Sequence, residues 1–487
     1  MKKRELLELA EKFYDEDQLA ELTHAIDFAT DKHRGQKRKS GEPFIIHPLS
    51  VAGILVDWGM DIDSVLAGVL HDTVEDTDAS LREIENYFGR DVGFLVDGVT
   101  KVSQARAGMR DIASYLPGTR DNLTKLLIAV GQDVRVIIIK LADRLHNMQT
   151  LEHQSPEKQQ KIARETLEVF APLADRLNMG RVRVQLEELS FSYLNPSEFK
   201  RLRKMMKDRL GKSHRKLATV RHDVNKKLDD DDIKHTMDGR IKSVYSLYKK
   251  LEKTDSIDDI YDLIALRIIV DDTATCYRVL GILHSMYTPM VARIKDYIAV
   301  PKPNGYQSLH TTIITPNEQI VEFQIRTAQM HEYAERGLAA SFHYNEQKLT
   351  DAYRKGYIAA MPANLRWIQE LQEVAAKLKA GEEVSMDHLK LDLFSDRIFV
   401  YSPKGDIYDL PMGAYPLDYA YRIHSDIGAR TYGFRVNDKM VSFDTPLHDG
   451  DKIEVLTKRS MKPKSDWLEW VTTEHARSKL RAQLKKQ

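Results

Sequence analysis

The stretch R-I-K-D-Y-I-A-V-P-K-P-N-G-Y-Q-S-L-H-T-T, residues 293–312, gathers cations around a break in regular structure. Pro301, Pro303 and Gly305 interrupt its middle, which predicts a rigid loop between two strands. Lys and Arg side chains on a preorganised loop suit a substrate with several phosphates, because each phosphate needs charge-assisted donors. Tyr306, beside a Gly at the loop tip, can lay its ring against a nucleobase. A basic surface loop without a ligand is the alternative interpretation.

A polar row follows downstream, in Q-I-V-E-F-Q-I-R-T, residues 319–327. Apolar and polar side chains alternate there, which predicts a half-buried strand. The polar face carries Glu322, Gln324 and Arg326, a carboxylate, an amide and a guanidinium that solubility alone does not require. This face favours a binding site over a bare surface loop.

Two segments upstream carry further charged groups. Residues 260–270, I-Y-D-L-I-A-L-R-I-I-V, predict a buried strand with Asp262 at its start and Arg267 inside it. An Arg in an apolar strand is costly unless it meets a partner. Residues 239–250, G-R-I-K-S-V-Y-S-L-Y-K-K, are expected to open a helix at its basic end. That helix would spread three cations over its first turns: Arg240, Lys242 and Lys250.

These blocks, in this order, resemble the synthetase domain of the RelA/SpoT homologue family, the (p)ppGpp alarmone enzymes. The resemblance implies transfer of the β,γ-pyrophosphate of ATP to the 3′-hydroxyl of GDP or GTP. It also implies that Asp262 and Glu322 hold Mg²⁺ and that Glu322 takes the hydroxyl proton. Arg240 and Arg267 would sandwich the adenine, and Tyr306 would stack on the guanine. The remaining nucleotide-binding residues would be Lys242, Lys250, Lys295, Lys302, Asn304, His310, Gln324 and Arg326. No G-x-x-x-x-G-K-[ST] motif occurs, so a P-loop is not the explanation.

Length and composition limit the number of domains, the partners and the compartment that the chain can have. A length of 487 residues predicts about three domains. Lys plus Arg and Asp plus Glu number 73 each, so net charge does not direct the chain to nucleic acid or membrane. The N-terminus mixes both signs of charge, unlike a signal peptide, and the apolar runs are too short to span a membrane. The single cysteine, Cys276, fits a reducing compartment. We therefore expect a cytoplasmic protein without membrane contact.

A different pattern occupies residue 1 to about residue 195, where apolar side chains recur at helical spacing. Three polar blocks lie inside it: F-I-I-H-P (44–48), H-D-T-V-E-D (71–76) and K-L-A-D-R-L-H-N-M (140–148). Four of their side chains predict a mixed nitrogen and oxygen site for a divalent cation that activates water: His47, His71, Asp72 and Asp143. Each His alone is better explained as a core residue, but the acidic cluster around the His-Asp pair needs a balancing charge.

The same three blocks look like the HD-type hydrolase domain of this family. The resemblance implies Mn²⁺ at those four ligands and removal of the 3′-pyrophosphate from (p)ppGpp. Glu75 and Asp76 would steer or deprotonate the attacking water. The residues that would hold the nucleotide are Arg38, Lys39, Ser40, Asn147 and Thr150.

The last part of the chain, about residues 392–456, changes character again. R-I-F-V-Y-S-P-K-G-D-I-Y-D-L predicts a hairpin, and D-G-D-K-I-E-V-L-T predicts a closing strand. A helix is expected between them, with four residues along it: Leu417, Ala420, Tyr421 and His424. This pattern resembles the TGS domain of the family, a small β-grasp module. In members that use the ribosome, this module meets the acceptor end of an uncharged tRNA with a His at the position of His424. A fold-stabilising contact of His424 is the alternative.

Together these patterns predict a multidomain α+β protein. It would combine an all-helical HD-type hydrolase domain, a mixed α/β nucleotidyltransferase-like synthetase domain and a β-grasp TGS domain. The expected boundaries are 1–195 for the hydrolase domain, 196–345 for the synthetase domain with its connecting helices, 346–391 for a helical linker, 392–456 for the TGS domain and 457–487 for a basic tail. The regulatory regions that long family members carry beyond TGS are not in this sequence, which fits either a shortened chain or a naturally short form.

The resemblance implies a bifunctional enzyme of the stringent response that uses ATP, GDP or GTP, and (p)ppGpp. Two other functions stay open. One is a hydrolase-dominant enzyme with a regulatory synthetase half, which loss of Asp262 or Glu322 would indicate. The other is a non-catalytic adaptor for tRNA or the ribosome, which eroded metal ligands would indicate. All of these residues are present, so the bifunctional enzyme is favoured.

Overall fold

A computed structural model describes most of the chain in two compact units. The described residues are 1–107, 133–252, 264–302, 304–318, 320–339 and 397–485. The first unit holds residues 1–104 and the described residues from 133 to 339, and the second holds residues 105–107 and those from residue 397 on. The expected helical linker, 346–391, lies outside the described residues. None of the described helices has the length and apolar character that crossing a membrane requires.

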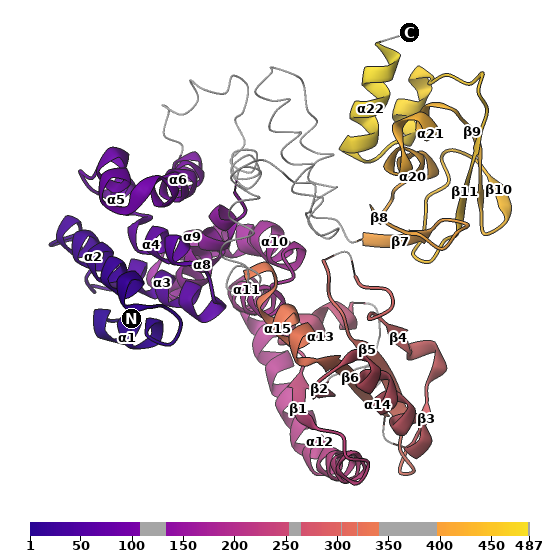
Figure 1. The fold of residues 1–487 in the computed structure, drawn as a ribbon, viewed down its shortest axis with the longest axis horizontal. Coiled ribbons are helices and arrows are strands. Elements are labelled where there is room, and N and C mark those ends of the chain that lie inside the picture. Colours follow the sequence, from indigo (N-terminus) through magenta and orange to yellow (C-terminus); the bar gives the residue numbers. More distant parts are fainter. Residues whose placement is uncertain (108–132, 253–263, 303, 319, 340–396, 486–487) are drawn as a thin grey trace. The chain divides into compact units, whose positions relative to one another are not determined.

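The first part of the first unit is built from helices, as the apolar spacing predicts (Figure 1). Their bounds are α1 Lys3–Ala10, α2 Glu16–Lys32, α3 Ile46–Trp58, α4 Ile62–Leu70, α5 Thr73–Asp76, α6 Leu81–Ala107, α8 Arg135–Gln149, η2 Leu151–His153, α9 Pro156–Glu165, η3 Thr166–Phe170, α10 Ala171–Arg176 and α11 Gly180–Leu194. Helices α3, α4 and α8 are buried on nearly all sides and form the centre of this part. A helix that is apolar all round belongs in a core, so the polar residues on these three helices are buried with it.

Local signals fix where the helices around this centre begin and end. Gly59 takes a left-handed conformation (φ 76°) that ends α3. Asp61 then caps α4, because its side chain accepts a hydrogen bond from the amide of Ser64 at 3.0 Å. Ser80 and Glu83 form a capping box before α6, with each side chain accepting from the other's amide. These signals fix the end of α3 and the starts of α4 and α6.

The second part of the first unit is a mixed sheet that follows a long helix. The elements are α12 Pro196–Asp230, β1 His235–Ile241, α13 Val244–Leu251, β2 Ile264–Val270, α14 Thr273–Met286, β3 Thr288–Pro289, η5 Val291–Arg293, β4 Lys295–Asp296, β5 Leu309–Ile314, β6 Ile320–Thr327 and α15 Ala328–Arg336. The strand order is β1-β2-β6-β5-β3, with β4 paired to β5. Only β2 and β6 run parallel among these described pairs.

One face of this sheet is apolar and covered by helices. α12 and α14 lie on it and contribute Val224 and Val279 to a core that includes Leu266 and Phe323 of the sheet. Cys276 of α14 is fully buried in the same core. Because side chains alternate along a strand, most polar residues of β1, β2, β5 and β6 project from the opposite face, whereas His235 and Thr311 contact the covering helices.

The structure corrects the prediction for residues 239–250. Arg240 lies on strand β1, whereas the helix α13 begins only at Val244. Ser243 caps this helix by accepting a hydrogen bond from the amide of Ser246 at 3.1 Å. The β1 residues pair with β2, and this pairing overrides the helical spacing of the cations.

The second unit is a small α+β fold. Its elements are β7 Arg397–Tyr401, β8 Ile407–Pro411, α20 Pro416–Ile423, α21 Ser425–Ala429, β9 Thr431–Val436, β10 Lys439–Val441, β11 Ile453–Thr457, η8 Ser465–Trp470 and α22 Glu474–Leu484. The predicted hairpin is confirmed as the β7–β8 pair, and the predicted closing strand is β11.

The segment 457–487, expected to be a basic tail, is folded as far as it is described. Trp467, Val471 and Leu480 pack into the same apolar core as Leu417 of α20. The apolar residues of this segment stand among many cations, so the sequence alone predicted a tail. The core shows which of these apolar residues are buried. A second correction concerns His424, which lies just past α20 in an extended conformation and not on that helix.

Candidate active sites

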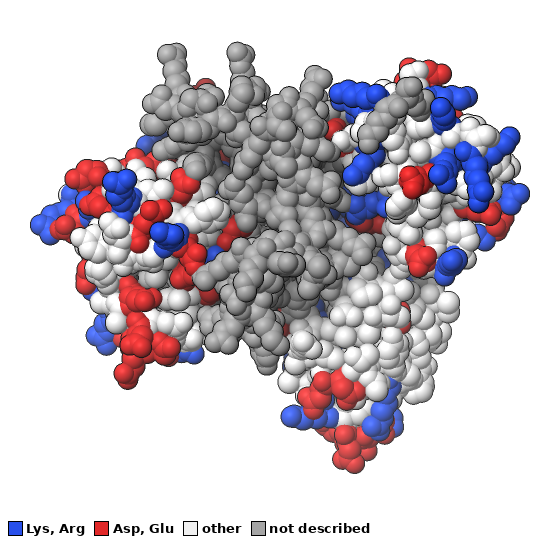
Figure 2. All heavy atoms as spheres, turned by 45° about the horizontal axis from the view of Figure 1, so that its top comes forward, with Lys and Arg blue, Asp and Glu red and all other residues white. Residues whose placement is uncertain are grey.

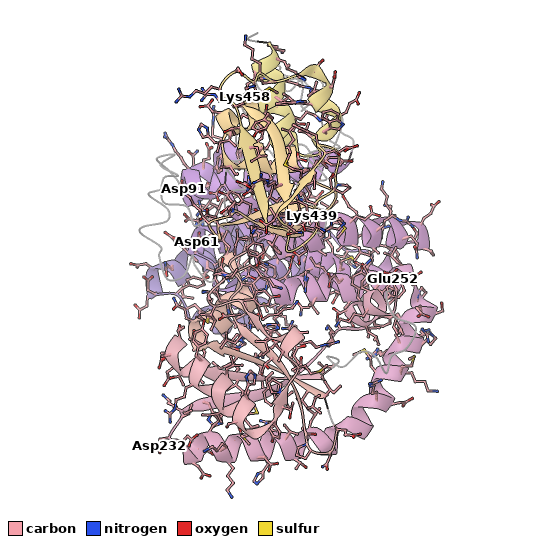
Figure 3. All side chains as sticks on the ribbon, turned by 90° about the vertical axis from the view of Figure 1, so that its right-hand side faces the viewer. Asp61, Asp91, Asp232, Glu252, Lys439 and Lys458 are labelled. Atoms are coloured by element: carbon pink, nitrogen blue, oxygen red, sulfur yellow. The ribbon has the colours of Figure 1, made fainter. Side chains whose placement is uncertain are left out.

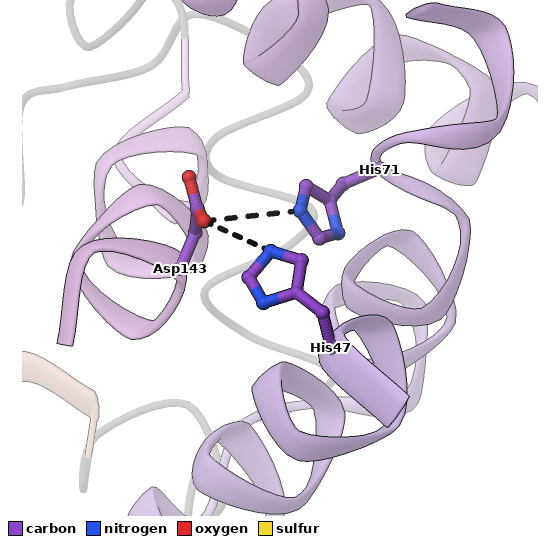
Figure 4. A group of neighbouring side chains, drawn as sticks. All are labelled: His47, His71 and Asp143. Atoms are coloured by element: carbon purple, nitrogen blue, oxygen red, sulfur yellow. Dashed lines mark ion pairs between the residues drawn. The ribbon is translucent and has the colours of Figure 1, made fainter. Parts of the chain in front are cut away.

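Three predicted metal ligands meet in the helical core (Figure 4). His47 comes from the start of α3, His71 directly follows α4, and Asp143 lies on α8. All three are buried, and their ligand atoms lie within 4.8 Å of one another. His47 Nε2 is 3.2 Å from Asp143 Oδ1, and His71 Nε2 is 4.0 Å from the same oxygen. Three helices therefore position side chains that are almost 100 residues apart in the sequence.

The fourth predicted ligand, Asp72, faces the same point. Its Oδ1 is 3.1 Å from His71 Nε2, and its Oδ2 is 3.6 Å from His47 Nε2. Asp72 reaches this place because it stands in the turn between α4 and α5, where the backbone is not part of a regular helix. Because of this turn, the adjacent side chains of His71 and Asp72 converge, whereas neighbours on one regular helix would point about 100° apart.

The hydrogen bonds of His71 suit a cation at this point. Its Nδ1 lies 2.8 Å from the carbonyl oxygen of Gly68, so Nδ1 carries the proton and donates it. In the neutral imidazole, His71 Nε2 then presents its lone pair, and this buried nitrogen lies 3.1 Å from Asp72 Oδ1 and 4.0 Å from Asp143 Oδ1. A buried nitrogen beside two carboxylates fits a divalent metal with imidazole and oxygen ligands.

The pKa values show how strongly this cluster favours positive charge. Burial lowers the pKa of His71, but the carboxylate of Asp72 outweighs burial and raises that pKa to about 9. Burial raises the pKa of Asp72, but the charge of His71 brings it down to about 2. The pKa of Asp143 lies well below its usual value because Lys140, 2.6 Å away, outweighs the effect of burial. Both carboxylates are therefore charged near neutral pH.

Glu75 and Asp76 lie beside this cluster on α5. Burial, and then the charge of Asp72, raises the pKa of both carboxyl groups. Gln36 holds the backbone at this point, because its amide nitrogen donates to the carbonyl oxygen of Asp76 at 2.8 Å. The amide oxygen of Gln36 lies 2.8 Å from His33 Nδ1. Neither His33 nor Gln36 was predicted from the sequence.

Three of the predicted nucleotide-binding residues of this part lie together. Arg38 Nη2 is 3.5 Å from Asn147 Oδ1 and 3.4 Å from Thr150 Oγ1. Asn147 also donates to Asp143, so the three residues stand next to the predicted metal ligands. The other two are close in sequence but point elsewhere in this state: Lys39 bonds Gln154 and Ser40 bonds Glu42. Gln154 is a contact that sequence analysis did not predict.

A second polar cluster lies on the open face of the sheet. The strand registers place one residue from each of five neighbouring strands in a row: Lys295, His310, Gln324, Arg267 and Asp238. Glu322 lies next to this row, two residues before Gln324 on β6. Because side chains on one face repeat every second residue, Arg240, Glu322 and Arg326 share this face.

Hydrogen bonds link these side chains into a network around Glu322. Glu322 Oε1 accepts from Gln324 Nε2 at 3.0 Å and lies 3.4 Å from His310 Nδ1. Arg240 donates to Gln324 Oε1 at 3.2 Å. The hydroxyl of Tyr306 lies 2.9 Å from His310 Nε2. The carboxylate is therefore oriented from two sides.

The buried Arg of the predicted strand does have partners. Arg267 donates to both carboxylate oxygens of Asp238, directly across the β1–β2 pair, and to Glu335 of α15 at 2.9 Å. Arg326, 1% exposed, keeps Nε and Nη2 without hydrogen-bond partners among the described residues. Burial lowers the pKa of Arg326 to about 10, so it is still charged at neutral pH. Its Nη2 lies 3.7 Å from Glu335 Oε1, an oxygen that Arg267 also contacts, so the ion pair is long and shared. A buried guanidinium that keeps donors without hydrogen bonds suits an anionic ligand.

In the loop of residues 293–312, beside this face, a lysine lies against two tyrosine rings. Lys302 Nζ lies 4.9 Å from the ring centre of Tyr297 and 5.1 Å from that of Tyr306. Tyr306 is half-buried, not exposed as its loop position suggests, since its ring contacts Tyr297 and His310. Tyr297 is a further aromatic residue that sequence analysis did not single out.

The other predicted residues of this site are less closely placed. Asn304 donates to the carbonyl oxygen of Asp175 at 3.1 Å, and its own Oδ1 accepts from the amide of Tyr306. Lys250 lies in the last turn of α13, and Lys242 lies between β1 and α13. Asp262, the predicted partner of Glu322 in metal binding, lies outside the described residues.

His424 in the second unit is a surface residue. Its side chain is 64% exposed, and its Nδ1 accepts a hydrogen bond from the amide of Asp426 at 3.2 Å. This contact caps the five-residue helix α21. The exposed ring leaves its other nitrogen open to solvent, so both predicted roles of His424 are compatible with the geometry.

Comparison with known protein families divides the chain in the same way. Residues 25–180 match an HD domain. Residues 239–349 match a region found in RelA and SpoT proteins. Residues 398–457 match a TGS domain. The polar clusters on α3, α4 and α8 and on the open face of the sheet lie inside the first two matches.

Individual proteins match over almost the whole chain. A GTP pyrophosphokinase from Myxococcus xanthus is 43% identical over 477 residues, which cover 98% of this chain and 62% of that protein. The bifunctional (p)ppGpp synthase/hydrolase SpoT of Escherichia coli is 40% identical over 481 residues, 99% of this chain and 67% of that protein. A solved structure of a metazoan orthologue of SpoT is 32% identical, covers 27% of this chain and 71% of that one, and has a TM-score of 0.23. The chain thus spans about three fifths of the length of the first of these relatives.

Proposed function

The chain belongs to the RelA/SpoT homologue family, and we propose that it is a bifunctional alarmone enzyme with two separate active sites. One site transfers pyrophosphate from ATP to the 3′-hydroxyl of GDP or GTP to make (p)ppGpp. The other hydrolyses (p)ppGpp to GDP or GTP and pyrophosphate. The observation that carries this proposal is the position of His71 Nε2, buried 3.1 Å from a carboxylate oxygen of Asp72 and 4.0 Å from one of Asp143, in a chain that also bears the polar sheet face.

We assign hydrolysis to the helical part. His47, His71, Asp72 and Asp143 would hold a divalent cation, for which we propose Mn²⁺. The cation would supply the charge that polarises the phosphate and lowers the pKa of a water molecule. Glu75 and Asp76 are suited to accept and return a proton, because burial raises their pKa values toward neutral pH. Arg38, with Asn147 and Thr150, would orient the nucleotide beside them.

We assign synthesis to the sheet. Glu322 would take the proton from the 3′-hydroxyl of the acceptor nucleotide, because Gln324 and His310 already orient its carboxylate. Glu322 with Asp262 would hold Mg²⁺. Arg267, fixed by Asp238, and Arg240 would flank the adenine. The phosphates would be held by the cations of the face and the loop, namely Lys242, Lys250, Lys295, Lys302 and Arg326. Transfer of a phosphoryl-type group depends mainly on such positioning and charge neutralisation.

For the second unit we propose a contact with tRNA through its surface near His424. This unit carries exposed Lys and Arg side chains, and Figure 2 shows several of them, with acidic residues among them, on one of its faces. Lys439 and Lys458 are two of them (Figure 3). Cations on a rigid surface contact the phosphate backbone without reading its sequence. We also propose a cytoplasmic location, because nucleotides are present there and its reducing conditions keep a single thiol free.

Two nucleotide assays test the bifunctional proposal. Protein with ATP, GDP and Mg²⁺ should form ppGpp, and protein with ppGpp and Mn²⁺ should release GDP and pyrophosphate. Asp72→Asn should lose only hydrolysis, whereas the matched Asp78→Asn, whose carboxylate is 88% exposed, should lose neither. Full-rate hydrolysis by chelator-treated protein, or by Asp72→Asn, would contradict the metal centre. Absence of ppGpp formation by the wild-type protein would contradict the synthetase assignment.

A further inference from the structure

His146 contacts a metal ligand but was not predicted to have a role. Its Nδ1 lies 2.8 Å from Nδ1 of His47, and the two ring centres are 4.9 Å apart. Both residues are buried, His47 4% and His146 8% exposed. His146 lies on α8, three residues after Asp143, so one helix carries both a ligand and a group that contacts another ligand.

The contact between two ring nitrogens requires a defined proton position. Two imidazole nitrogens form a hydrogen bond only when one of them carries a proton and the other presents a lone pair. His47 Nε2 faces Asp143 and Asp72 at 3.2 and 3.6 Å, on the side of the predicted cation. If that nitrogen is to bind a cation, it cannot carry a proton. The proton of a neutral His47 must then be on Nδ1, which makes His146 Nδ1 the acceptor.

We propose that His146 is a positioning residue of the hydrolase site, which accepts a hydrogen bond from His47 and thereby keeps the lone pair of His47 Nε2 directed at the metal. His146 does not touch the cation or the nucleotide in this role. Ligating histidines in metal sites commonly donate their second nitrogen to an oxygen or nitrogen acceptor that fixes ring and tautomer. A neighbouring histidine is an unusual acceptor, because it serves only while it is neutral with its proton on Nε2.

The backbone of His146 supports this orientation. Its carbonyl oxygen accepts from Thr150 Oγ1 at 3.1 Å, one turn further along α8. Thr150 in turn lies 3.4 Å from Arg38. The acceptor is thus built into the same turn of helix as the residues proposed to hold the nucleotide. This proposal rests on the proposed function, because it gives a role to His146 only if the four residues around His71 bind a metal.

The test compares two substitutions by direct Mn²⁺ binding. In His146→Asn, the side-chain oxygen replaces Nδ1 as an acceptor, whereas His146→Leu removes the acceptor and keeps an apolar side chain. Metal-free protein is titrated with Mn²⁺ and the free ion is measured by its electron paramagnetic resonance signal. We expect Mn²⁺ binding about 10–100-fold weaker in His146→Leu, and within about threefold of the wild type in His146→Asn.

The controls separate this inference from the proposed function. Pyrophosphate transfer at the sheet, measured for each variant, should equal the wild-type rate and reports that the chain is folded. His71→Ala should abolish the tight Mn²⁺ site; if the wild-type protein has no such site, the proposed metal centre itself fails. If the wild type binds Mn²⁺ and His146→Leu binds it equally well, only the role of His146 is refuted. Equal losses in the Asn and Leu variants would also refute it, because packing of the ring and not the acceptor would then matter.

Discussion

Glu322 is held by two neighbours before any substrate arrives. Gln324 donates to its Oε1, and His310 Nδ1 lies 3.4 Å from the same oxygen. Glu322→Gln is nearly isosteric, but it removes both the negative charge and the basicity of the group. We expect pyrophosphate transfer to fall by about 10²–10⁴-fold, because a general base contributes that range. Hydrolysis of ppGpp by the same variant should be unchanged, and loss of both activities in folded protein would argue for one shared site.

Gln36 is a second residue whose contacts predict an effect. It connects His33 to the backbone of Asp76, and these side-chain hydrogen bonds do not involve any of the proposed metal ligands. Gln36→Leu should let the end of α5 shift. Because small misplacements of reacting groups are costly, we expect the kcat of hydrolysis to fall about 10–100-fold. Mn²⁺ binding should stay at the wild-type level. Lys37→Leu, a substitution at an exposed neighbouring residue, is the matched control. If both variants had the same kcat, the role of Gln36 would be refuted.

At the scale of elements, Asp418 joins two helices of the second unit. This carboxylate on α20 is 1% exposed and accepts from the amides of Tyr415, Thr472 and Thr473. It also accepts from the Thr473 hydroxyl, which itself caps α22. The segment 457–487 therefore depends on a residue about 55 positions earlier in the sequence.

Asp418→Ala should detach α22 from this unit. Loss of several hydrogen bonds to one buried charged group predicts destabilisation of about 3 kcal/mol. Hydrogen exchange of the α22 amides measures the change, and these amides should exchange much faster in the variant. Asp466→Ala removes an exposed carboxylate nearby and should leave exchange unaltered. Unchanged protection of α22 in Asp418→Ala would show that apolar packing alone holds the helix.

At the scale of the whole molecule, the two candidate sites use no residue in common. One is built on α3, α4, α5 and α8, the other on β1, β2, β5 and β6. His71→Ala should therefore abolish hydrolysis while synthesis continues, so that ppGpp accumulates in a mixture of ATP and GDP. Thin-layer separation of the labelled nucleotides over time measures both reactions at once. Continued breakdown of ppGpp by this variant would place the hydrolytic centre elsewhere.

Much of the fold is determined by short-range pattern. The alternation in residues 319–327 predicts strand β6, and the Ser80–Glu83 pair predicts the start of α6, because pleat and capping depend only on near neighbours. The residue types of the proposed metal ligands are also readable from three short motifs. The helix predicted for residues 239–250 was wrong in its first half, since pairing with β2 decides the conformation of Arg240.

Contacts between distant segments were decided only by the tertiary structure. The sequence by itself determined that His47, His71, Asp72 and Asp143 are ligand types in helical surroundings. It did not reveal that His146 faces His47, 99 positions away, or that Asp238 pairs with Arg267 across two strands. The physical reason is that periodicity fixes which face of an element is buried, whereas strand register and helix packing fix which residue lies opposite.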